Sequence, residues 1–385
     1  MISITDKSRC CGCSACFAAC PKDAITMKQD PLGFRYPETD HAKCVDCGIC
    51  EKVCAFGQKG NGTLPEAYAV RHKDFSVVRE STSGAVFTAL SDTILENGGT
   101  VYGAAYDADF HVIHKRVEDK AGRDWLRKSK YVQSDMGDVF RQVRADLKEG
   151  RQVLFSGTPC QTAGLKSYIG PALCGSLYLV DIVCHGVPSP KVWESYLEWM
   201  QEKEGDRILG VNFRDKAYGW RSCVETFEFK GKKVASKSYA YMYYKHLALR
   251  ESCSVCPYAD VSRPSDITLA DYWRKDKTCP EFASDNMGCS LVLCHTAKGR
   301  EFLQSVSSSL MMVRTDLDRC IQPNMVRPSA LHPQRKRFEH DFLTRGLEYV
   351  MKRYGDRGWR YRITSTLTAI YQFFRQTARK ILGRR

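Results

Sequence analysis

The sequence predicts a small α+β domain, then a larger α/β domain with a mixed sheet, and finally a basic amphipathic helix. Three observations support this prediction. Nine of the 19 cysteines lie within the first 56 residues in a repeated pattern, the middle of the chain alternates between strand-like and helix-like stretches, and apolar residues recur at helical spacing near the end. We expect these three parts to span residues 1–60, 66–330 and 331–385.

Composition excludes several classes of protein. Of the 385 residues, 43% are hydrophobic and 26% are charged, a balance that supplies a full core and excludes wholesale disorder. No apolar run is long enough to span a bilayer, and the opening MISITDKSRCC lacks the apolar stretch of a secretory signal. We therefore expect a reducing, cytoplasmic location, where cysteines serve as metal or cluster ligands more often than as disulfides.

The formal charge of +14 invites a nucleic-acid interpretation, which its distribution weakens. Half of this excess lies within residues 355–385. Cluster-bound thiolates lower the total further, since each four-cysteine [4Fe-4S] cluster carries roughly −2. Only the tail combines basic with aromatic residues, and its aromatic residues lie on the apolar face, so we expect no nucleic-acid partner.

Two cysteine runs with identical spacing are the strongest motif in the chain. Each reads C-x2-C-x2-C-x3-C, with Pro21 after the first run and Ala55 after the second. Three closely spaced thiolates hold one face of a cubane, and the fourth serves the other cluster. Zinc sites also use C-x2-C pairs, but they do not need two runs of four at equal spacing. The stretch resembles the bacterial two-cluster ferredoxin domain, and Cys11 fits neither run. The expected ligand sets are Cys10, Cys13, Cys16 and Cys54 for one [4Fe-4S] cluster, and Cys20, Cys44, Cys47 and Cys50 for the other.

The middle of the chain alternates between helices and strands. A polar, glycine-rich linker at 57–67 precedes it. A hairpin-like region at 208–235, with its turn at Gly231, indicates a mixed sheet. The expected elements are a helix capped by Ser83 and ended by Gly98, a helix at 138–147, and strands at 101–106, 153–155 and 177–184.

A second set of cysteines lies in the larger domain. Cys160 and Cys184 follow two of the predicted strands, and thiols at the carboxyl ends of neighbouring parallel strands converge. Cys253 and Cys256 form a further C-x2-C pair. From spacing alone, a third [4Fe-4S] cluster, a zinc site and unrelated core thiols all remain open. Cys279 and Cys289 are reserve ligands.

Eight stretches over about residues 66–300 resemble the coenzyme F420 hydrogenase/dehydrogenase beta-subunit family. The resemblance implies FAD beside a [4Fe-4S] cluster held by Cys160, Cys184, Cys253 and Cys256. It also implies hydride exchange with the deazaflavin coenzyme F420 or with another organic substrate, including an intermediate of surface-polysaccharide biosynthesis. The stretches are STSGAVFTAL (81–90), GGTVYGAAYD (98–107), SKYVQSD (129–135), VLFSGTPCQTAGL (153–165), DIVCHGVPSP (181–190), NFRDKAYGW (212–220), CSVCPYAD (253–260) and SDITLADYW (265–273).

Several residues are candidates for holding the flavin. Ser83 and Gly84 match a Ser-Gly-Gly motif of this family, in which Ala85 replaces the second glycine, and a helix start there offers N–H groups to a diphosphate. Gly157 and Thr158 form a turn that exposes backbone donors, or a loop that only positions Cys160. No GxGxxG follows a predicted strand, so the common dinucleotide fingerprint is missing.

Lys130 and His185 are the candidate catalytic residues. Lys130 either neutralises a phosphate near the flavin or is one solvated lysine in a basic run. His185 either handles the proton that accompanies hydride transfer or only hydrogen-bonds its surroundings. Arg214, with Trp220 nearby, faces a substrate or forms a surface turn.

These features predict an iron–sulfur flavoprotein oxidoreductase with FAD, a third cluster, a small-molecule hydride donor or acceptor, and a redox partner protein such as a ferredoxin or an oxidoreductase subunit. The alternative is a non-catalytic electron-transfer subunit. The amphipathic tail, from Ile363 to Leu382, either packs on the protein or contacts the inner face of an anionic membrane.

Overall fold

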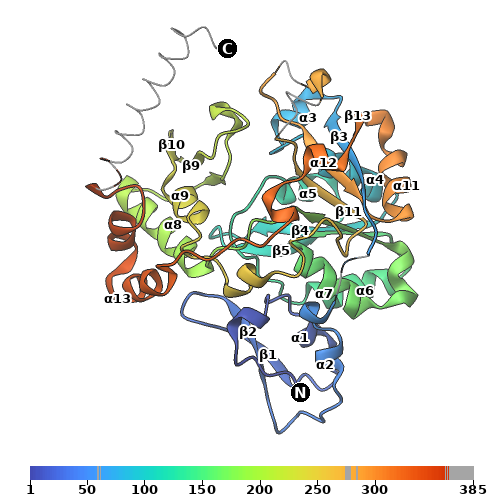
Figure 1. Ribbon diagram of the computed structural model, residues 1–385, viewed down its shortest axis with the longest axis horizontal. Helices are drawn as coiled ribbons and strands as arrows, with labels where there is room; N and C mark the ends of the chain where they lie inside the picture. Colours follow the sequence, from blue (N-terminus) through green and yellow to red (C-terminus); the bar gives the residue numbers. More distant parts are fainter. Residues whose placement is uncertain are drawn as a thin grey trace.

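The computed structural model describes residues 1–58, 60, 62–273, 279–282, 285–359, 361 and 363. Figure 1 shows a small N-terminal domain that projects below a large sheet, with a helical region beside the sheet. Most of the predicted amphipathic tail lies outside the described residues. Within the described part of the chain, no helix is both long enough and apolar enough to cross a membrane.

The N-terminal domain consists of an antiparallel hairpin and short helical turns that carry the cysteines. Ile25 pairs with Thr39 at one end of the hairpin and Gln29 with Arg35 at the other. The elements are η1 (Lys7–Arg9), α1 (Ala15–Ala19), β1 (Ile25–Gln29), β2 (Arg35–Thr39), α2 (Ile49–Lys52) and η2 (Ala55–Gly57).

The larger domain is built on a mixed sheet of eight strands, as the sequence predicts for the fold class. The inner strands β11, β7, β6 and β4 are parallel, and the strands outside them are antiparallel. In sheet order the strands are β13 (Leu310–Thr315), β3 (Glu66–His72), β12 (Ser290–Cys294), β11 (Ile267–Asp271), β7 (Leu177–Ile182), β6 (Val153–Gly157), β4 (Thr100–Tyr106) and β5 (Val112–Val117).

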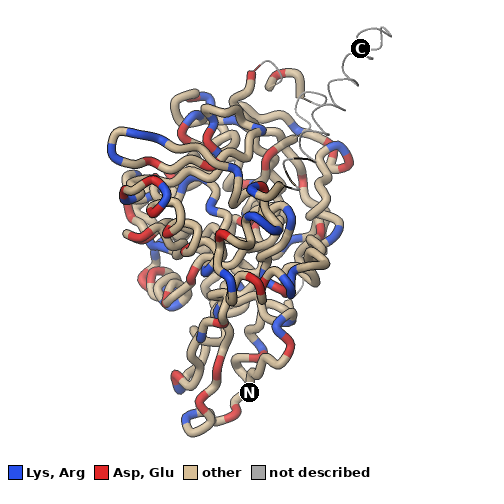
Figure 2. The backbone as a smooth tube through the Cα atoms, turned by 90° about the vertical axis from the view of Figure 1, so that its left-hand side faces the viewer, with Lys and Arg blue, Asp and Glu red and all other residues tan. Residues whose placement is uncertain are grey.

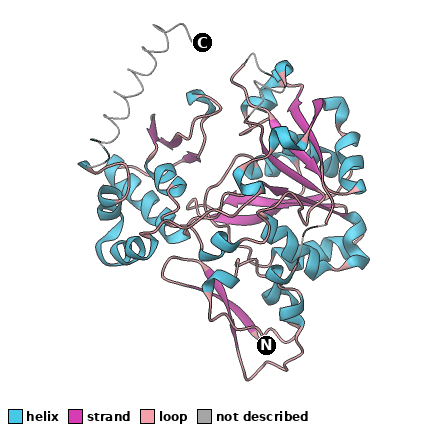
Figure 3. Ribbon diagram, viewed as in Figure 1, coloured by secondary structure: helices cyan, strands magenta, loops and turns pink. Residues whose placement is uncertain are grey.

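Helices cover both faces of this sheet (Figure 3). Successive residues of a strand point to opposite faces, so Val153 and Phe155 of β6 pack on one helical layer and Leu154 packs on the other. Cys11, Cys13 and the small residues of α1 share the core of the first layer, which joins the N-terminal domain to the sheet. The first layer is α6 (Val139–Lys148) and α7 (Pro159–Ile169), and the second is α4 (Val86–Glu96), α5 (Lys120–Leu126) and α11 (Ala297–Ser305).

A helical region with its own small sheet packs beside the main sheet. The hairpin predicted around Gly231 is present, but it forms this separate sheet, and the main sheet is mixed because of β3, β5, β12 and β13. The region contains α8 (Pro190–Glu204), β8 (Gly210–Asn212), η4 (Lys216–Tyr218), β9 (Glu225–Phe229), β10 (Lys232–Ser236), α9 (Ser238–Tyr244) and α13 (Arg335–Arg353).

Short elements connect these layers. They are α3 (Phe75–Arg79), η3 (Pro171–Ser176), η5 (Glu251–Val255), η6 (Pro280–Phe282), η7 (Ser307–Ser309), α12 (Leu317–Cys320) and η8 (Pro323–Met325). Figure 2 shows basic and acidic residues distributed together along the described chain, without a single-sign stripe in that view.

Candidate functional site

The two cysteine runs adopt the same local backbone. Gly12 and Asp46 occupy equivalent positions before the second cysteine of each run, and both have positive φ, 67° and 49°. Ser14 and Gly48, two residues later, are also left-handed and precede the short helices α1 and α2. Because left-handed residues alternate with the cysteines, each loop curls and presents its thiols on one side.

Two cavities in the N-terminal domain each contain one of the predicted sets of four cysteines. The structure brings together the sets that the spacing predicts, including the exchange of the fourth cysteine between runs. Cys10, Cys13, Cys16 and Cys54 line one cavity, and Cys20, Cys44, Cys47 and Cys50 line the other.

A third cavity lies between the two domains and contains the four cysteines predicted as a third ligand set. β6 and β7 are parallel neighbours, so Cys160 and Cys184, which follow them, converge as predicted. Cys253 and Cys256, in and just after η5, complete the set. The reserve ligands Cys279 and Cys289 lie elsewhere, in the core around β12.

The spacing of these thiols does not suit a single ion. Within the described residues, no group of three or more His, Cys, Asp or Glu side chains is arranged to hold one metal ion. Tetrahedral zinc with Zn–S bonds of about 2.3 Å requires sulfur atoms only about 3.8 Å apart. Sets of four cysteine thiolates are also the usual ligands of a [4Fe-4S] cluster.

Cys11 lies between two of the three sets, a position that the sequence does not reveal. Its thiol hydrogen-bonds with those of Cys13 and Cys160, and it lines both the first and the third cavity. Gly164, one turn into α7, makes this approach possible, because a Cβ there would lie 2.8 Å from Cys13 Sγ. The first and third thiol sets are therefore immediate neighbours.

The thiols of the third set differ in how readily they ionise. A hydrogen bond with Cys11 lowers the pKa of Cys160 to about 7, against the effect of burial. Burial raises the pKa of Cys253 to about 12 and that of Cys256 to about 11. Binding of a metal cluster to these groups must therefore release protons.

A much larger cavity, of about 400 Å³, adjoins the third thiol set. It lies at the carboxyl ends of β6, β7 and β11, where ligands of open α/β sheets bind. Cys184 and His185 line both this cavity and the third thiol cavity. Its volume is within the usual range for small-molecule and cofactor sites, roughly 300–1,000 Å³.

Comparison with known proteins identifies this combination of domains. Residues 9–58 match the 4Fe-4S dicluster domain model. Residues 150–318 match the model for the C-terminal region of the coenzyme F420 hydrogenase/dehydrogenase beta subunit. These residues form a domain of the coenzyme F420 hydrogenase/dehydrogenase beta-subunit family. The dicluster domain makes the chain an iron–sulfur electron-transfer protein that holds [4Fe-4S] clusters.

Among solved structures, a chain in the xenon-derivatised F420-reducing [NiFe] hydrogenase complex from Methanosarcina barkeri is similar to this chain. The two share 18% identity with a TM-score of 0.47, over 77% of this chain and 95% of that chain. No curated protein matches the chain.

Among the candidate flavin contacts, Ser83 lines the large cavity but Gly84 does not. Ser83 Oγ donates to the Cys289 carbonyl at 2.9 Å, so it does not cap α4, which starts at Val86. The Gly84 N–H donates to Ser290 Oγ at 2.9 Å, and a Cβ on Gly84 would lie 2.3 Å from the Val70 carbonyl oxygen. The structure thus gives Gly84 a packing role against β3 and β12 in place of the predicted phosphate contact.

Ala85 takes the N-cap position of α4 with a φ of 67°. A left-handed backbone conformation costs a non-glycine residue about 1–2 kcal/mol, and glycine avoids this cost. Glycine also makes the unfolded chain more flexible, which cancels part of the gain in stability. We expect Ala85→Gly to stabilise the protein by about 0.5–1 kcal/mol, seen as a higher melting temperature. Ala89→Gly, within the same helix, is the control and should destabilise by about 1 kcal/mol. An equal loss of stability in Ala85→Gly and Ala89→Gly would contradict the assignment of backbone strain to Ala85.

The turn after β6 is fixed by a chain of hydrogen bonds. Gln161 Oε1 accepts from the Thr158 N–H at 2.9 Å, and Gln161 Nε2 donates to Ser134 Oγ at 2.9 Å. Ser134 in turn lies 2.8 Å from Nδ1 of the buried His114. Gly157 and Thr158 line the large cavity, so this network holds that part of the wall in one conformation.

Lys130 lines the large cavity, as its predicted role requires. Its Nζ donates to the carbonyls of Arg127 and Lys128 at 2.8 and 3.3 Å, and no ion pair joins it to a carboxylate in the described part of the chain. Burial, together with the charge of Lys128, lowers the pKa of Lys130 to about 7. An anion bound in the cavity would stabilise the protonated, positively charged form of Lys130 and pair with it.

His185 is part of a hydrogen-bonded pair of histidines. Asn324 Nδ2 donates to Ser329 Oγ, which turns its Oδ1 toward His185 Nδ1 at 3.0 Å. His185 Nε2 lies 2.7 Å from Nε2 of His246, whose Nδ1 lies 2.6 Å from the Ala330 carbonyl. Both Nδ1 atoms face acceptors and therefore donate, which leaves the two Nε2 atoms facing each other. Burial, together with the neighbouring His246, lowers the pKa of His185.

An aromatic and charged wall completes the large cavity. Arg214, which the sequence leaves between a substrate-facing role and a surface turn, is buried, lines this cavity and pairs with Asp271. Tyr131 and Tyr243 stack at 4.9 Å with an interplanar angle of 22°. Sequence reasoning did not assign the tyrosines to a site, although Tyr131 lies within the SKYVQSD stretch (129–135).

Proposed function

We propose that this chain is an iron–sulfur flavoprotein oxidoreductase in which three [4Fe-4S] clusters exchange electrons with FAD. The proposed ligands are the three cysteine sets described above, with FAD in the large cavity. The bound flavin would supply hydride chemistry and convert two-electron transfer into single-electron steps.

The observation that carries this proposal is the position of Cys184. It lines both the third thiol cavity and the large cavity, so a cluster bound by this set would lie at the wall of the organic cofactor site. The chain itself thereby supplies a short path between inorganic and organic redox groups. A subunit that only relayed electrons among clusters would not need the adjoining large cavity.

The large cavity suits a flavin dinucleotide in size and chemistry. Lys130, Lys128 and Arg127 line one part of it and can neutralise a diphosphate. Tyr131, Tyr243 and Trp273 supply aromatic surface for planar rings. The turn at Gly157 and Thr158 lies between the cavity and the Cys160 helix.

We propose that Lys130 fixes the anionic part of the flavin and that His185 holds the proton that accompanies hydride transfer. The direct contact between His185 Nε2 and His246 Nε2 supports the second role, because His246 is only half-buried and can pass protons between water and His185. The hydride partner that we propose is a deazaflavin of the F420 type, on the strength of the family match over residues 150–318. A surface-polysaccharide intermediate is the alternative substrate.

Electrons would reach the clusters from a redox partner protein, a ferredoxin or another oxidoreductase subunit. The ligand set of Cys20, Cys44, Cys47 and Cys50 is the more accessible one in the N-terminal domain, and Cys47 is exposed. No disulfide ties up any of the twelve proposed ligand thiols, which is consistent with the proposed reducing, cytoplasmic location.

The test is anaerobic purification followed by measurement of iron, sulfide and released flavin per chain. We expect about 12 irons and one flavin. The optical bleaching of a deazaflavin with a reduced electron donor then tests the hydride step. About 8 irons without flavin would leave only the electron-transfer function of the dicluster domain. Zinc in place of iron would contradict the proposal entirely.

A further inference from the structure

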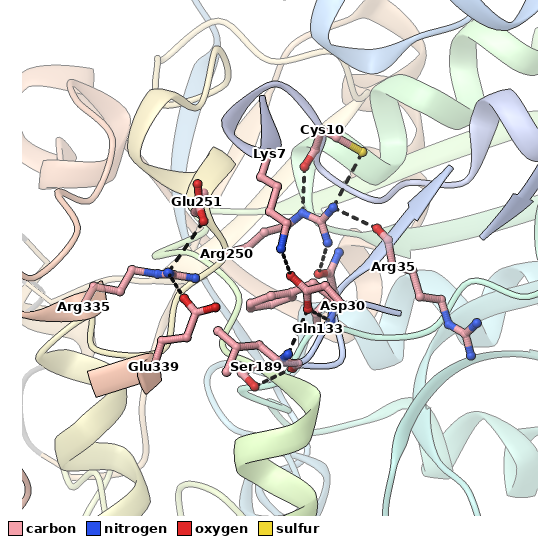
Figure 4. Close-up of polar contacts among 12 residues, drawn as sticks. Lys7, Cys10, Asp30, Arg35, Gln133, Ser189, Arg250, Glu251, Arg335 and Glu339 are labelled. Carbon is pink, nitrogen blue, oxygen red and sulfur yellow. Dashed lines mark hydrogen bonds and ion pairs between the residues drawn. The ribbon is translucent and has the colours of Figure 1, made fainter. Parts of the chain in front are cut away.

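Arg250 is a fully buried cation at the junction of the two domains. Its guanidinium donates to the carbonyl oxygens of Cys10 at 2.7 Å and Arg35 at 2.9 Å. It also donates to Gln133 Oε1 at 2.9 Å and approaches Cys10 Sγ at 3.6 Å (Figure 4). Every oxygen in this shell is neutral.

The carboxylates around Arg250 are paired with other cations. Figure 4 shows Asp30 bonded to Lys7, and both Glu251 and Glu339 turned toward Arg335. No carboxylate of the described residues forms an ion pair with Arg250. The rings of Tyr36 and Phe34, with centroids 4.1 and 5.4 Å from Arg250 Cζ, offset only part of the cost of burying this charge. A buried cation without a counter-charge is unfavourable, so this position calls for an anion that the side chains do not supply.

The fold makes room for this guanidinium beside two thiol sets. A Cβ on Gly12, between Cys10 and Cys13, would lie 2.9 Å from Arg250 Nη1, so glycine there lets the first cysteine loop close tightly over the guanidinium. Arg250 also lines the third thiol cavity. One cation therefore faces both inner cysteine sets.

We propose that Arg250 is the built-in counter-cation of the two inner clusters and makes both of them easier to reduce than the outer cluster of Cys20, Cys44, Cys47 and Cys50. This inference rests on the proposed function. In each transfer one electron leaves the outer cluster, which is oxidised, and enters an inner one, which is reduced, with no bond made or broken. The inner cluster becomes more negative by one charge, and a cation in a medium of low dielectric stabilises that state.

The test compares Arg250→Gln, Arg250→Lys and the control Arg335→Gln in anaerobically purified full-length protein. Redox titration followed by electron paramagnetic resonance measures the midpoint potential of each cluster, and Cys47→Ala identifies the outer signal. In Arg250→Gln the reduced-to-oxidised ratio of an inner cluster at fixed potential should fall at least about tenfold. The midpoint potential of the outer cluster should stay close to its wild-type value in Arg250→Gln. All the cluster potentials of Arg250→Lys and Arg335→Gln should also stay close to those of the wild type.

Two outcomes would overturn the inference. The first is unchanged inner potentials in an Arg250→Gln protein that carries its full iron. The second applies if Arg250→Gln does not load iron. If Arg250→Lys also fails to load iron, the guanidinium's hydrogen bonds matter and its charge does not, which overturns the inference. If Arg250→Lys does load iron, the result supports the inference. Wild-type protein without a third cluster or flavin would instead contradict the proposed function itself.

Discussion

Replacing Cys160 with alanine is expected to lower the iron content from about 12 to about 8 per chain, because one of three four-iron clusters loses a ligand. Cys160 follows β6 and lines the third cavity with Cys184, Cys253 and Cys256. Flavin should stay bound, since the large cavity does not depend on this thiol. Reduction of the flavin by the two remaining clusters should be lost, because the link beside Cys184 is missing.

Cys11→Ala is the matched control for this experiment. Cys11 is a buried thiol in the same cavity lining and hydrogen-bonds with Cys160, but it belongs to neither repeated run. We expect it to keep all three clusters, because Cys11 is not one of the twelve proposed ligands. If Cys11→Ala lost four irons and Cys160→Ala lost none, the proposed ligand set would be wrong. Iron and sulfide analysis decides between the two.

Replacing Lys130 with glutamate is expected to weaken flavin binding by about 100-fold. A charge-assisted hydrogen bond contributes roughly 1.5–3 kcal/mol, and each 1.4 kcal/mol is a factor of ten in affinity. Lys130 lines the large cavity with no carboxylate ion pair of its own among the described residues, so reversing its charge places a carboxylate against a phosphate. Flavin titration of flavin-free protein, monitored by fluorescence, gives the affinity. Lys148→Glu, an exposed charge reversal at the end of α6, should bind flavin normally.

The pH dependence of flavin binding follows from the same lysine. Because its pKa is lowered to about 7, Lys130 is largely neutral above pH 7 in the empty cavity and charged below it. Binding a diphosphate requires the charged form, so it takes up a proton and raises the pKa of Lys130. Affinity should therefore increase as the pH falls from 8 to 6. A Lys130→Met protein should bind flavin more weakly, and its affinity should change little with pH. If its affinity changed with pH as much as that of the wild type, the pH dependence would belong to another group.

Much of the first domain could be predicted from the spacing of its cysteines. The C-x2-C-x2-C-x3-C runs require left-handed residues between thiols, and glycine or a small polar residue stands at each such position. Short-range patterns also located β4, β6 and β7, whose apolar residues are consecutive because both faces are buried. The start of α4 was misplaced, because Ser83 bonds to Cys289, a residue 206 positions away in the sequence.

The sequence by itself determined the local features: two cluster loops, buried parallel strands, and thiols placed after them. Only the tertiary structure decided which groups meet. It placed Cys11 between two thiol sets, turned Gly84 into a packing residue and paired His185 with His246. It also left Arg250 without a carboxylate among the described residues at the junction of both domains. These relations depend on contacts between residues far apart in the chain, and spacing carries information only about neighbours along it.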